Sequence, residues 1–448
     1  MRKNRLRGNN PLAARAGLAL AISLLALSLI VVAGVSATGA DAPRLAQARA
    51  PAAPEGGGGG WTPLGGPMVA GGQVNALAVH PAMSGTLYAA VAPIGAYDSG
   101  PTVIYKTVDG AATWTPVYTA QHQVYSLAVS GTRVYAGAFN PGGEGASLYL
   151  SQDSGLNWSP VFSFTSRGVW TDLSIQGGDP DTALASGWTY NDGLGRDEGV
   201  VYRTTDGGLS WTPLLTVSVP GDNAHVVAIL SHPFTPTLIL GAVNTDSSPD
   251  STIYRSDDGG ATWPLSYTVS GADVMSLIAH SGNPQLLYAG TGSSSFTGGP
   301  FWVFRSTDAG LTWSEVLTTG GGRLAFEPPN TVHALAGWGE LWSSPADGDP
   351  DSWSSTGNVD GEAIAFALDL GPAPAALYAG GGQRGVYKSG DGGANWQLQN
   401  GTIESLVQPA DVEIDPQNPD KILAVGECLG YWLTTDGGGS WAQPWPQE

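Results

Sequence analysis

Acidic and aromatic residues gather in one segment of the chain, Trp188 to Glu198. Its sequence is Trp188-Thr189-Tyr190-Asn191-Asp192, then three residues, then Arg196-Asp197-Glu198. Aromatic rings can stack on sugar rings, and carboxylates can accept hydrogen bonds from sugar hydroxyls. Two carboxylates at a set separation can also cleave a glycosidic bond. Nothing in the spacing marks such a pair. The segment therefore predicts either ligand contacts (Trp188, Tyr190 and Arg196) or catalytic carboxylates (Asp192, Asp197 and Glu198).

Further polar and aromatic residues stand in other loops. Asp360 and Glu362 extend the set of candidate catalytic carboxylates, and Trp338 and Arg384 extend the set of candidate ligand contacts. The other loop candidates are Tyr97, Asp98, Trp170, Asp222, Asp246, Asp250, Glu340 and Glu427. Loops are polar in most proteins, so a single residue of this set does not define a site.

Metal and nucleophile chemistry find little support in the sequence. The six His are scattered without the His-x-x-x-His spacing of zinc sites, and no Gly-x-Ser-x-Gly segment would expose a serine nucleophile. Cys428 is the single cysteine, so no internal disulfide is expected. Asp347, Asp349 and Asp351 alternate like the start of a calcium loop, but no Glu follows at the required distance. Calcium there is a minor hypothesis, and no cofactor is predicted.

The net charge of −20 limits the partners of the chain. A strongly acidic surface repels nucleic-acid phosphates and anionic lipids. We therefore expect no nucleic-acid partner, and membrane association only through an uncleaved N-terminal segment. The 65 glycines and 32 prolines indicate many tight turns, and 42% hydrophobic residues can fill a core.

Residues 1–37 are typical of a secretory signal peptide. Basic residues precede an apolar run from Ala16 to Gly34, and the small residues Val35-Ser36-Ala37 fit a cleavage site. A membrane anchor is the alternative, because about 18 apolar residues can span a bilayer. Residues 38–60, rich in Ala, Pro and Gly, predict a flexible linker. We expect the chain outside the cytoplasm, as a secreted, periplasmic or cell-surface protein.

Residues 61–448 repeat one pattern of short apolar runs. Each unit holds three such runs, a Gly-rich turn, and a run that opens with Trp. Short runs bounded by turn residues predict strands, and four strands recurring roughly every 40–55 residues predict the blades of a propeller. The sequence thus predicts an all-β fold, a single β-propeller of four-stranded blades. Eight copies of the turn favour eight blades, and seven blades with one unit displaced are the alternative.

The turn before the fourth run, here named the repeated turn, is the strongest signal. Ser or Thr stands two residues before an Asp, and Trp five residues after it. The carboxylate is expected to accept N–H bonds, the Gly two residues after the Asp to adopt a special backbone conformation, and the Trp to pack between sheets. Ala111 replaces that Gly in the first copy, which predicts distortion, and a degenerate copy from Ser344 to Trp353 aligns on Asp347. The seven regular copies contain Asp109, Asp153, Asp206, Asp258, Asp308, Asp391 and Asp436, with Trp114, Trp158, Trp211, Trp263, Trp313, Trp396 and Trp441.

The repeated turn resembles the Asp-box, or BNR, repeat of sialidases, oligoxyloglucan-type glycoside hydrolases, sortilin-type receptors and photosystem assembly factors. The resemblance covers residues 61–448 and implies a β-propeller whose boxes lie opposite the functional face. That face would be built by the loop after the second strand and the loop entering the first. The acidic and aromatic loop residues would converge there, which suits a carbohydrate.

The catalytic signatures of these families are missing. No Arg-Ile-Pro motif occurs, and the arginines away from the repeated turns are scattered: Arg133, Arg167, Arg196, Arg323 and Arg384. The Asp-Val-Gly-Gly segment of oligoxyloglucan-type enzymes, which pair two propellers, is absent, as is the basic patch of the photosystem assembly factors. We predict an exported, non-catalytic propeller that binds a glycan, peptide or protein partner through its loop face. A glycoside hydrolase using two loop carboxylates is the alternative.

Overall fold

The computed structural model describes residues 68–70, 73–93, 101–140, 147–176, 179–292, 301–359, 363–372, 374–381, 385–400, 404–406, 409–414, 422–426 and 430–435. The predicted signal segment and linker lie outside these residues. So do the candidate residues Tyr97, Asp98, Asp360, Glu362, Arg384, Glu427, Asp436 and Trp441. Within the described ranges, no helix has the length and apolar character needed to cross a membrane.

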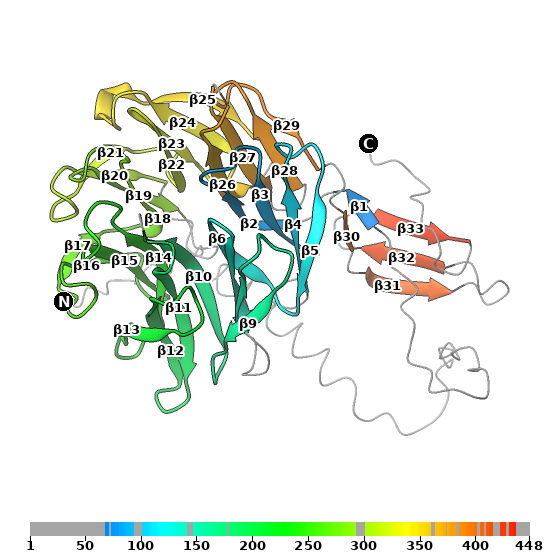
Figure 1. Ribbon diagram of the computed structural model, residues 1–448, viewed down its shortest axis with the longest axis horizontal. Helices are drawn as coiled ribbons and strands as arrows, with labels where there is room; N and C mark the ends of the chain where they lie inside the picture. Colours follow the sequence, from blue (N-terminus) through cyan, green and yellow to red (C-terminus); the bar gives the residue numbers. More distant parts are fainter. Residues whose placement is uncertain are drawn as a thin grey trace, which may run out of the picture. The chain divides into compact units, whose positions relative to one another are not determined.

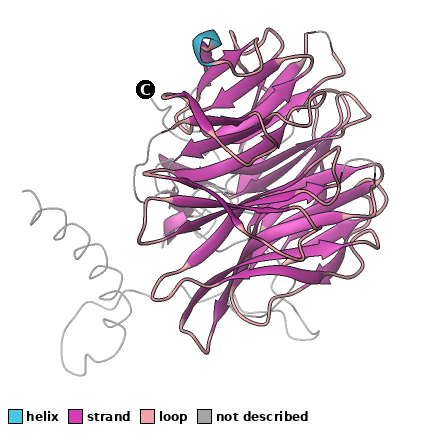
Figure 2. Cartoon of the chain, turned by 90° about the vertical axis from the view of Figure 1, so that its left-hand side faces the viewer, coloured by secondary structure: helices cyan, strands magenta, loops and turns pink. Residues whose placement is uncertain are grey.

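Antiparallel β-sheet makes up nearly all of the regular structure (Figure 2). The strands β2 to β29 form five four-stranded sheets and one eight-stranded sheet, in which β10 pairs with β7 and so joins two successive sets of four. In chain order they make seven units of four strands. Units one to three contain β2 (Gln73–Val79), β3 (Leu87–Ala92), β4 (Thr102–Thr107), β5 (Thr115–Ala120); β6 (Val124–Ser130), β7 (Arg133–Asn140), β8 (Leu148–Ser151), β9 (Ser159–Phe162); and β10 (Gly168–Ile175), β11 (Ala183–Asn191), β12 (Arg196–Thr204), β13 (Thr212–Val217). Units four and five contain β14 (Ala224–Ser231), β15 (Ile239–Thr245), β16 (Ser251–Ser256), β17 (Leu265–Val269); and β18 (Asp273–Ala279), β19 (Leu287–Gly292), β20 (Val303–Ser306), β21 (Ser314–Leu317). Units six and seven contain β22 (Arg323–Glu327), β23 (Thr331–Leu335), β24 (Glu340–Ser344), β25 (Ser354–Asn358); and β26 (Ala363–Asp369), β27 (Ala376–Gly381), β28 (Gly385–Ser389), β29 (Gln397–Leu398).

A short 3-10 helix, η1 (Pro350–Ser352), precedes β25. Outside the seven units, β1 (Met68–Ala70) pairs with β30 (Glu404–Leu406). A three-stranded sheet follows, with β31 (Pro409–Ile414), β32 (Ile422–Gly426) and β33 (Gly430–Thr434).

In each unit the four strands lie side by side in chain order. The second strand is the most buried; every residue of β3, for example, is buried. The fourth strand is the most exposed, as in β5, which begins with two exposed residues. This gradient follows from the sequence, because apolar and small residues fill the second runs while Thr, Pro and Ser open the fourth.

Neighbouring units are held together by hydrophobic clusters, one for each of the seven contacts between consecutive units, including the contact between unit seven and unit one. In that closing cluster, Val74 and Leu87 of unit one pack with Tyr378 of unit seven. Polar contacts reinforce the closure, because the Asp369 carboxylate accepts the Gly85 N–H at 2.7 Å.

The ring therefore closes with seven four-stranded units of the described chain, which is the architecture of a β-propeller (Figure 1). The predicted blades are confirmed as four-stranded. The predicted count of eight is not confirmed.

Six repeated turns of the described chain have the predicted geometry. In the fourth copy, Asp258 Oδ1 accepts the Thr262 N–H at 2.9 Å and Oδ2 accepts the Thr262 hydroxyl at 2.6 Å, while the Ser256 hydroxyl donates to Oδ1 at 2.8 Å. Gly260 has a φ of +93°, and the Trp263 indole donates to its carbonyl at 3.0 Å. The same hydrogen bonds to the Asp recur at Asp109, Asp153, Asp206, Asp308 and Asp391.

The turn at Ala111 is not distorted, contrary to the sequence prediction. Ala111 takes a φ of +75°, and the Asp109 hydrogen bonds to Thr107 and Thr113 remain. A left-handed Ala is sterically disfavoured, so the intact turn contains local strain.

The degenerate copy is out of register with the sequence alignment. Asp347 has a φ of +52° and Gly348 a φ of +71°, the conformations of the two residues that follow the Asp in a regular turn. Ala346 therefore occupies the position of the Asp, and Asp347 the position after it. The Ser352 hydroxyl bonds to Ser344 in this turn. The inserted residue before Trp353 hid this shift in the sequence.

Candidate functional site

Each blade has two edges. At the turn edge lie the repeated turn and the connection from first to second strand, joined in blade three by a 2.9 Å bond from the Gly207 N–H to the Asp181 carbonyl. At the opposite loop edge the first strand begins and the second strand ends. The segment 188–198 forms the loop-edge hairpin of β11 and β12, as the sequence predicted.

The register of this hairpin determines on which of its two faces each side chain lies. Trp188 pairs with Gly199 and Tyr190 with Asp197, and because side chains alternate along a strand, Trp188, Tyr190 and Asp197 share one face. That face turns toward blade four, since a Cβ on Gly199 would meet Val226 at 3.0 Å. Arg196 and Glu198 lie on the other face.

Arg167 completes the first face. It precedes β10, and its carbonyl accepts the Tyr190 N–H at 2.9 Å, which extends the ladder into the loop. Its guanidinium lies over the rings of Trp188 and Tyr190, 5.6 and 5.1 Å from their centroids, and its Nη2 donates to Asp197 Oδ1 at 3.3 Å. The Asp197 side chain is 6% exposed and that of Arg167 is 49% exposed, so the cation faces solvent while its counter-ion is buried.

Blade four supplies His225 to the same place. Its Nε2 lies 3.4 Å from Asp197 Oδ2, its Nδ1 lies 3.7 Å from Asp246 Oδ1, and its ring is 5.3 Å from that of Trp188. Asn223 joins the two acids, accepting the Asp197 N–H at 2.8 Å and donating to Asp246 at 2.7 Å. Arg167, Trp188, Tyr190, Asp197 and His225 are named the Arg167 cluster.

The other predicted residues of blade three have partners outside this cluster. Asp192 accepts the Ser166 hydroxyl at 3.0 Å, Glu198 accepts the Asn191 amide at 2.7 Å, and Arg196 donates to the Ser218 hydroxyl at 3.0 Å. Asp192, Asp197 and Glu198 thus each have a separate partner, and Asp197 and Glu198 lie on opposite faces of the hairpin.

Trp170 was predicted as a loop-face residue, and this is wrong. It is fully buried and packs on Phe164 and Tyr202 in the core between blades two and three.

Trp338 is 50% exposed beside Phe301, with ring centroids 4.1 Å apart, at the loop edge of blade six. Glu340 accepts the Ser355 hydroxyl at 3.0 Å. Asp222 and Asp250 accept hydrogen bonds from neighbouring loop residues.

The calcium hypothesis gains no support. Asp347 bonds His280 at 3.2 Å and Asp349 pairs with Arg305, so these carboxylates point to different partners. No group of three or more potential ligands occurs among the described residues.

The sequence interpretation dismissed Arg167 as one of several scattered arginines and overlooked His225. The signal that could have found them was position. Arg167 directly precedes the first strand of its blade and His225 is the second residue of the next first strand, where the loop entering strand one was expected to contribute.

No protein-family model matches the chain. The photosystem II assembly lipoprotein Ycf48 of Synechococcus sp. (strain CC9902) is 24% identical over 208 residues, which is 44% of this chain and 56% of that protein. A xyloglucanase of Hypocrea jecorina (strain QM6a) is 34% identical over 93 residues, 20% of this chain and 10% of the enzyme. The crystal structure of an ancestral GH74 enzyme aligns with a TM-score of 0.58 at 17% identity, covering 86% of this chain and 55% of that one.

These likenesses support the β-propeller fold. The chain spans about half the length of the Ycf48 relative and of the GH74 structure. The proteins it is similar to include both an assembly protein and a glycoside hydrolase, so sequence similarity does not distinguish a binding function from a catalytic one.

Proposed function

We propose that this chain is a non-catalytic binding module that holds a protein or glycan partner on its loop edge, with the Arg167 cluster as the anchor. The observation that carries the proposal is the half-exposed Arg167 guanidinium, which lies over two aromatic rings and is fixed from behind by buried Asp197. Arginine and aromatic residues are the side chains that most often dominate binding interfaces.

The arrangement supports recognition of an anionic or polar group. A guanidinium offers several N–H donors in one plane, and the aromatic rings beneath it leave the outer donors available to a carboxylate or hydroxyl. Trp188 and Tyr190 add apolar surface for a side chain or a sugar ring. The Ycf48 relative, named for assembly of photosystem II, agrees with a binding role, as the xyloglucanase agrees with a glycan.

Catalysis by the candidate carboxylates is less well supported. A glycoside hydrolase requires two carboxyl groups about 5–9 Å apart that face each other across the substrate. Asp197 of the cluster and Asp246 beside it do not face each other directly, because His225 contacts both carboxylates. The candidates Asp360 and Glu362 lie outside the described residues.

The test is a binding measurement with matched arginine variants of the full chain on glycan and peptide libraries. Arg167→Gln should weaken binding roughly tenfold or more, because it removes the anchor cation. Arg196→Gln removes a cation from the other face of the same hairpin and should leave binding unchanged.

A sugar-release assay on polysaccharides and sialosides distinguishes this proposal from the alternative, a glycoside hydrolase. Our proposal predicts no release. Release that disappears in Asp192→Ala, Asp197→Ala or Glu198→Ala would establish a hydrolase and overturn it.

A further inference from the structure

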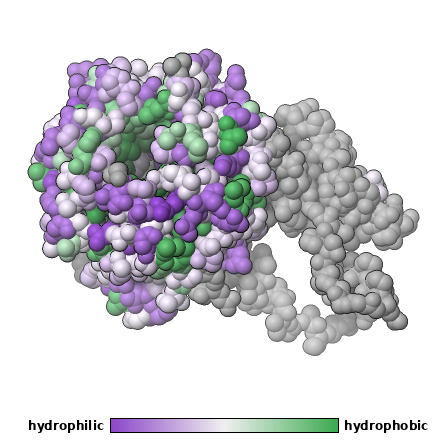
Figure 3. All heavy atoms as spheres, in the orientation of Figure 1, coloured by the Kyte–Doolittle hydropathy of each residue, from purple (hydrophilic) through white to green (hydrophobic). Residues whose placement is uncertain are grey.

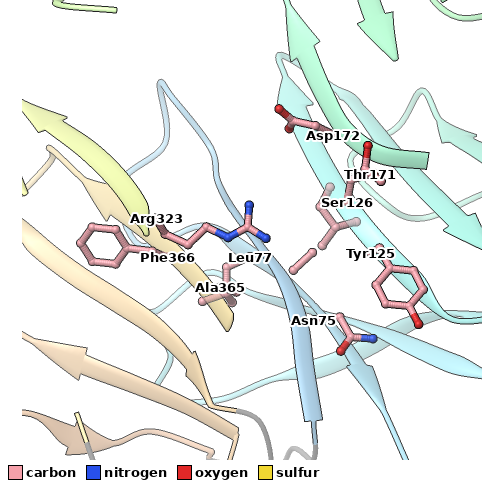
Figure 4. A pocket seen from close by; sticks show the side chains of 11 residues that line it. Asn75, Leu77, Tyr125, Ser126, Thr171, Asp172, Arg323, Ala365 and Phe366 are labelled. Carbon is pink, nitrogen blue, oxygen red and sulfur yellow. The ribbon is translucent and has the colours of Figure 1, made fainter. Parts of the chain in front are cut away.

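A second polar site lies at the centre of the ring. A cavity of about 140 Å³, named the channel cavity, is bordered by first strands from blades one, two, three, six and seven (Figure 4). Figure 3 shows the corresponding hollow at the centre of the ring. Its polar lining residues are Asn75, Tyr125, Ser126, Thr171, Asp172 and Arg323.

The backbone explains why polar side chains meet there. The first strands β2, β6 and β10 share a register shift at the same point, which leaves Asn75, Tyr125 and Thr171 without a paired residue on the second strand. A bulge of this kind re-aims the extra side chain. All three residues line the channel cavity.

Arg323 is the cation of the cavity. It opens β22, its guanidinium projects toward the centre (Figure 4), and its Nη1 donates to the Met275 carbonyl at 3.0 Å. None of the ion pairs found among the described residues includes it. Burial lowers the pKa of Arg323, and nearby Asp172 partly restores it. A half-buried guanidinium, with N–H groups beyond the one that bonds Met275, favours an anionic ligand.

Asn75 adds a second free donor. The residue is 8% exposed, and its Oδ1 accepts the Gln73 amide at 2.9 Å. Its buried Nδ2 finds no acceptor on the described protein. A buried N–H group without a partner costs about 1–3 kcal/mol, so an acceptor placed in the cavity would be stabilised.

Asp172 does not use these donors. Its Oδ1 accepts the Leu173 N–H at 2.8 Å and its Oδ2 the Ile229 N–H at 3.0 Å, so it fastens blade three to blade four. Burial raises the pKa of Asp172 to about 6, against the lowering effect of these bonds and of Arg323.

We propose that the channel cavity binds a small free carboxylate anion, of acetate to succinate size, through the Arg323 guanidinium and the Asn75 amide. The Arg323 guanidinium and the Asn75 amide both offer donors, one of them charged, and a carboxylate can accept from two donors at once. This site is separate from the Arg167 cluster and does not depend on the proposed binding function.

Asp172 couples this binding to protons. Ionised Asp172 opposes a second carboxylate in the cavity, and protonation removes that opposition. Binding is therefore stronger below pH 6 than above it, and the bound anion raises the pKa of Asp172 in return. Arg323 and Tyr125 are the other titratable residues lining the cavity. The Tyr125 hydroxyl donates to Gln123 at 2.7 Å.

The test is NMR on the full chain with ¹³C-acetate and ¹³C-succinate at pH 5.5 and 7.5, at constant ionic strength. In the wild type we expect saturation transfer between the ligand and the Tyr125 ring, with several-fold tighter binding at pH 5.5. Arg323→Gln and Asn75→Ala should weaken binding, the former about tenfold or more. Arg196→Gln, a cation on the loop edge, is the control and should bind as the wild type does.

Three results would overturn the proposal. The first is an absence of ligand transfer to Tyr125 in the wild type, a readout that does not depend on the folding of any variant. The second is equal affinity in wild type and Asn75→Ala together with no pH dependence. A peptide with a free C-terminal carboxylate and its amidated twin form a further arm. Binding of the acid peptide without any binding of acetate would assign the cavity to a polypeptide and also overturn the proposal.

Discussion

The two edges of the propeller contrast sharply. At the turn edge the same bonds recur, with the residue before each Trp donating its backbone N–H to the Asp at 2.8–2.9 Å in six copies of the described chain. At the loop edge the repetition stops, and blade three carries a longer hairpin with Arg167, Trp188, Tyr190 and Asp197. The repeated residues of this chain build the scaffold, and the residues that depart from the repeat set the loop edge of blade three apart.

The two edges also differ in how they treat charge. In the repeated turns the Asp carboxylates are exposed or half-buried and accept several hydrogen bonds, which lower the pKa of Asp109, Asp153, Asp206, Asp258 and Asp391 to about 2. At the loop edge Asp197 is buried and its partner Arg167 is left facing solvent. The first arrangement closes a turn, and the second leaves a cation open to solvent, where we propose that the partner binds.

The largest effect separates two tryptophans, one from each edge. Trp313 of the fifth repeated turn is 6% exposed in the core between blades four and five, whereas Trp338 is 50% exposed. Trp313→Ala should lower the free energy of unfolding by about 3–5 kcal/mol. Trp338→Ala should lower it by about 1 kcal/mol or less. Urea unfolding measures both, and equal losses would break the contrast between the edges.

Acid should affect the turn edge next. Because the folded pKa of the turn aspartates lies below the unfolded value of 3.8, their contribution is present above pH 4 and is lost as the pH falls toward 2. Solvent screening keeps the contribution of each turn to the free energy of unfolding small, but the contributions of six turns add up. Urea unfolding between pH 5 and 2 measures the effect, and Asp109→Asn should flatten the slope. An unchanged slope in that variant would show that the turn carboxylates are not responsible.

A smaller pH effect is expected from His232, at the turn edge of blade four. Its Nδ1 accepts the Thr235 N–H at 3.0 Å, and burial lowers the pKa of the imidazole. A folded pKa below the unfolded value gives stability that is present at pH 7 and declines below about 6.5.

The matched variant is His232→Asn, whose amide oxygen can accept the same bonds without titrating. The wild-type melting temperature should fall roughly 1–3 °C more than that of the variant between pH 7 and 5. Parallel curves would contradict the assignment.

The smallest effect concerns Ala111. Its left-handed conformation costs about 1–2 kcal/mol, while its buried methyl contributes about 0.8 kcal/mol and a Gly would cost about 0.5–1 kcal/mol in entropy, so Ala111→Gly should change stability by less than about 1 kcal/mol. The control Ala90→Gly, at a buried residue of β3, should instead lower stability by about 1.5 kcal/mol. Chemical denaturation compares them, and similar losses in both variants would show that the Ala111 turn stores no strain.

Much of the fold could be predicted because the repeat is local. The Ser/Thr, Asp and Trp of each turn are within eight residues, and their bonds depend only on that spacing. The loop-edge hairpin was found for the same reason, since Trp188, Tyr190 and Asp197 are close in sequence.

What could not be predicted depends on the packing between blades. Arg167 and His225 meet only because blade four packs on blade three, and Trp170 is buried because its bulged strand turns it into the core between blades two and three. The shift at Asp347 required backbone angles, and the bulges that bring Asn75 and Tyr125 to the channel cavity leave no mark in the residue pattern. The ring count depends on which units meet at the closure, which no single repeat encodes.

The central claim is that the loop edge of blade three binds the partner, whereas the turn edge stabilises the fold. It is tested most directly by one arginine from each edge, Arg167→Gln and Arg203→Gln, compared with wild type on the same glycan and peptide libraries. Arg203 donates to the Gly259 carbonyl at 2.9 Å, between two repeated turns. We predict that Arg167→Gln loses the wild-type binding signals at unchanged melting temperature, while Arg203→Gln keeps them. Retention of every signal by Arg167→Gln, or loss of the signals in Arg203→Gln alone, would contradict the account.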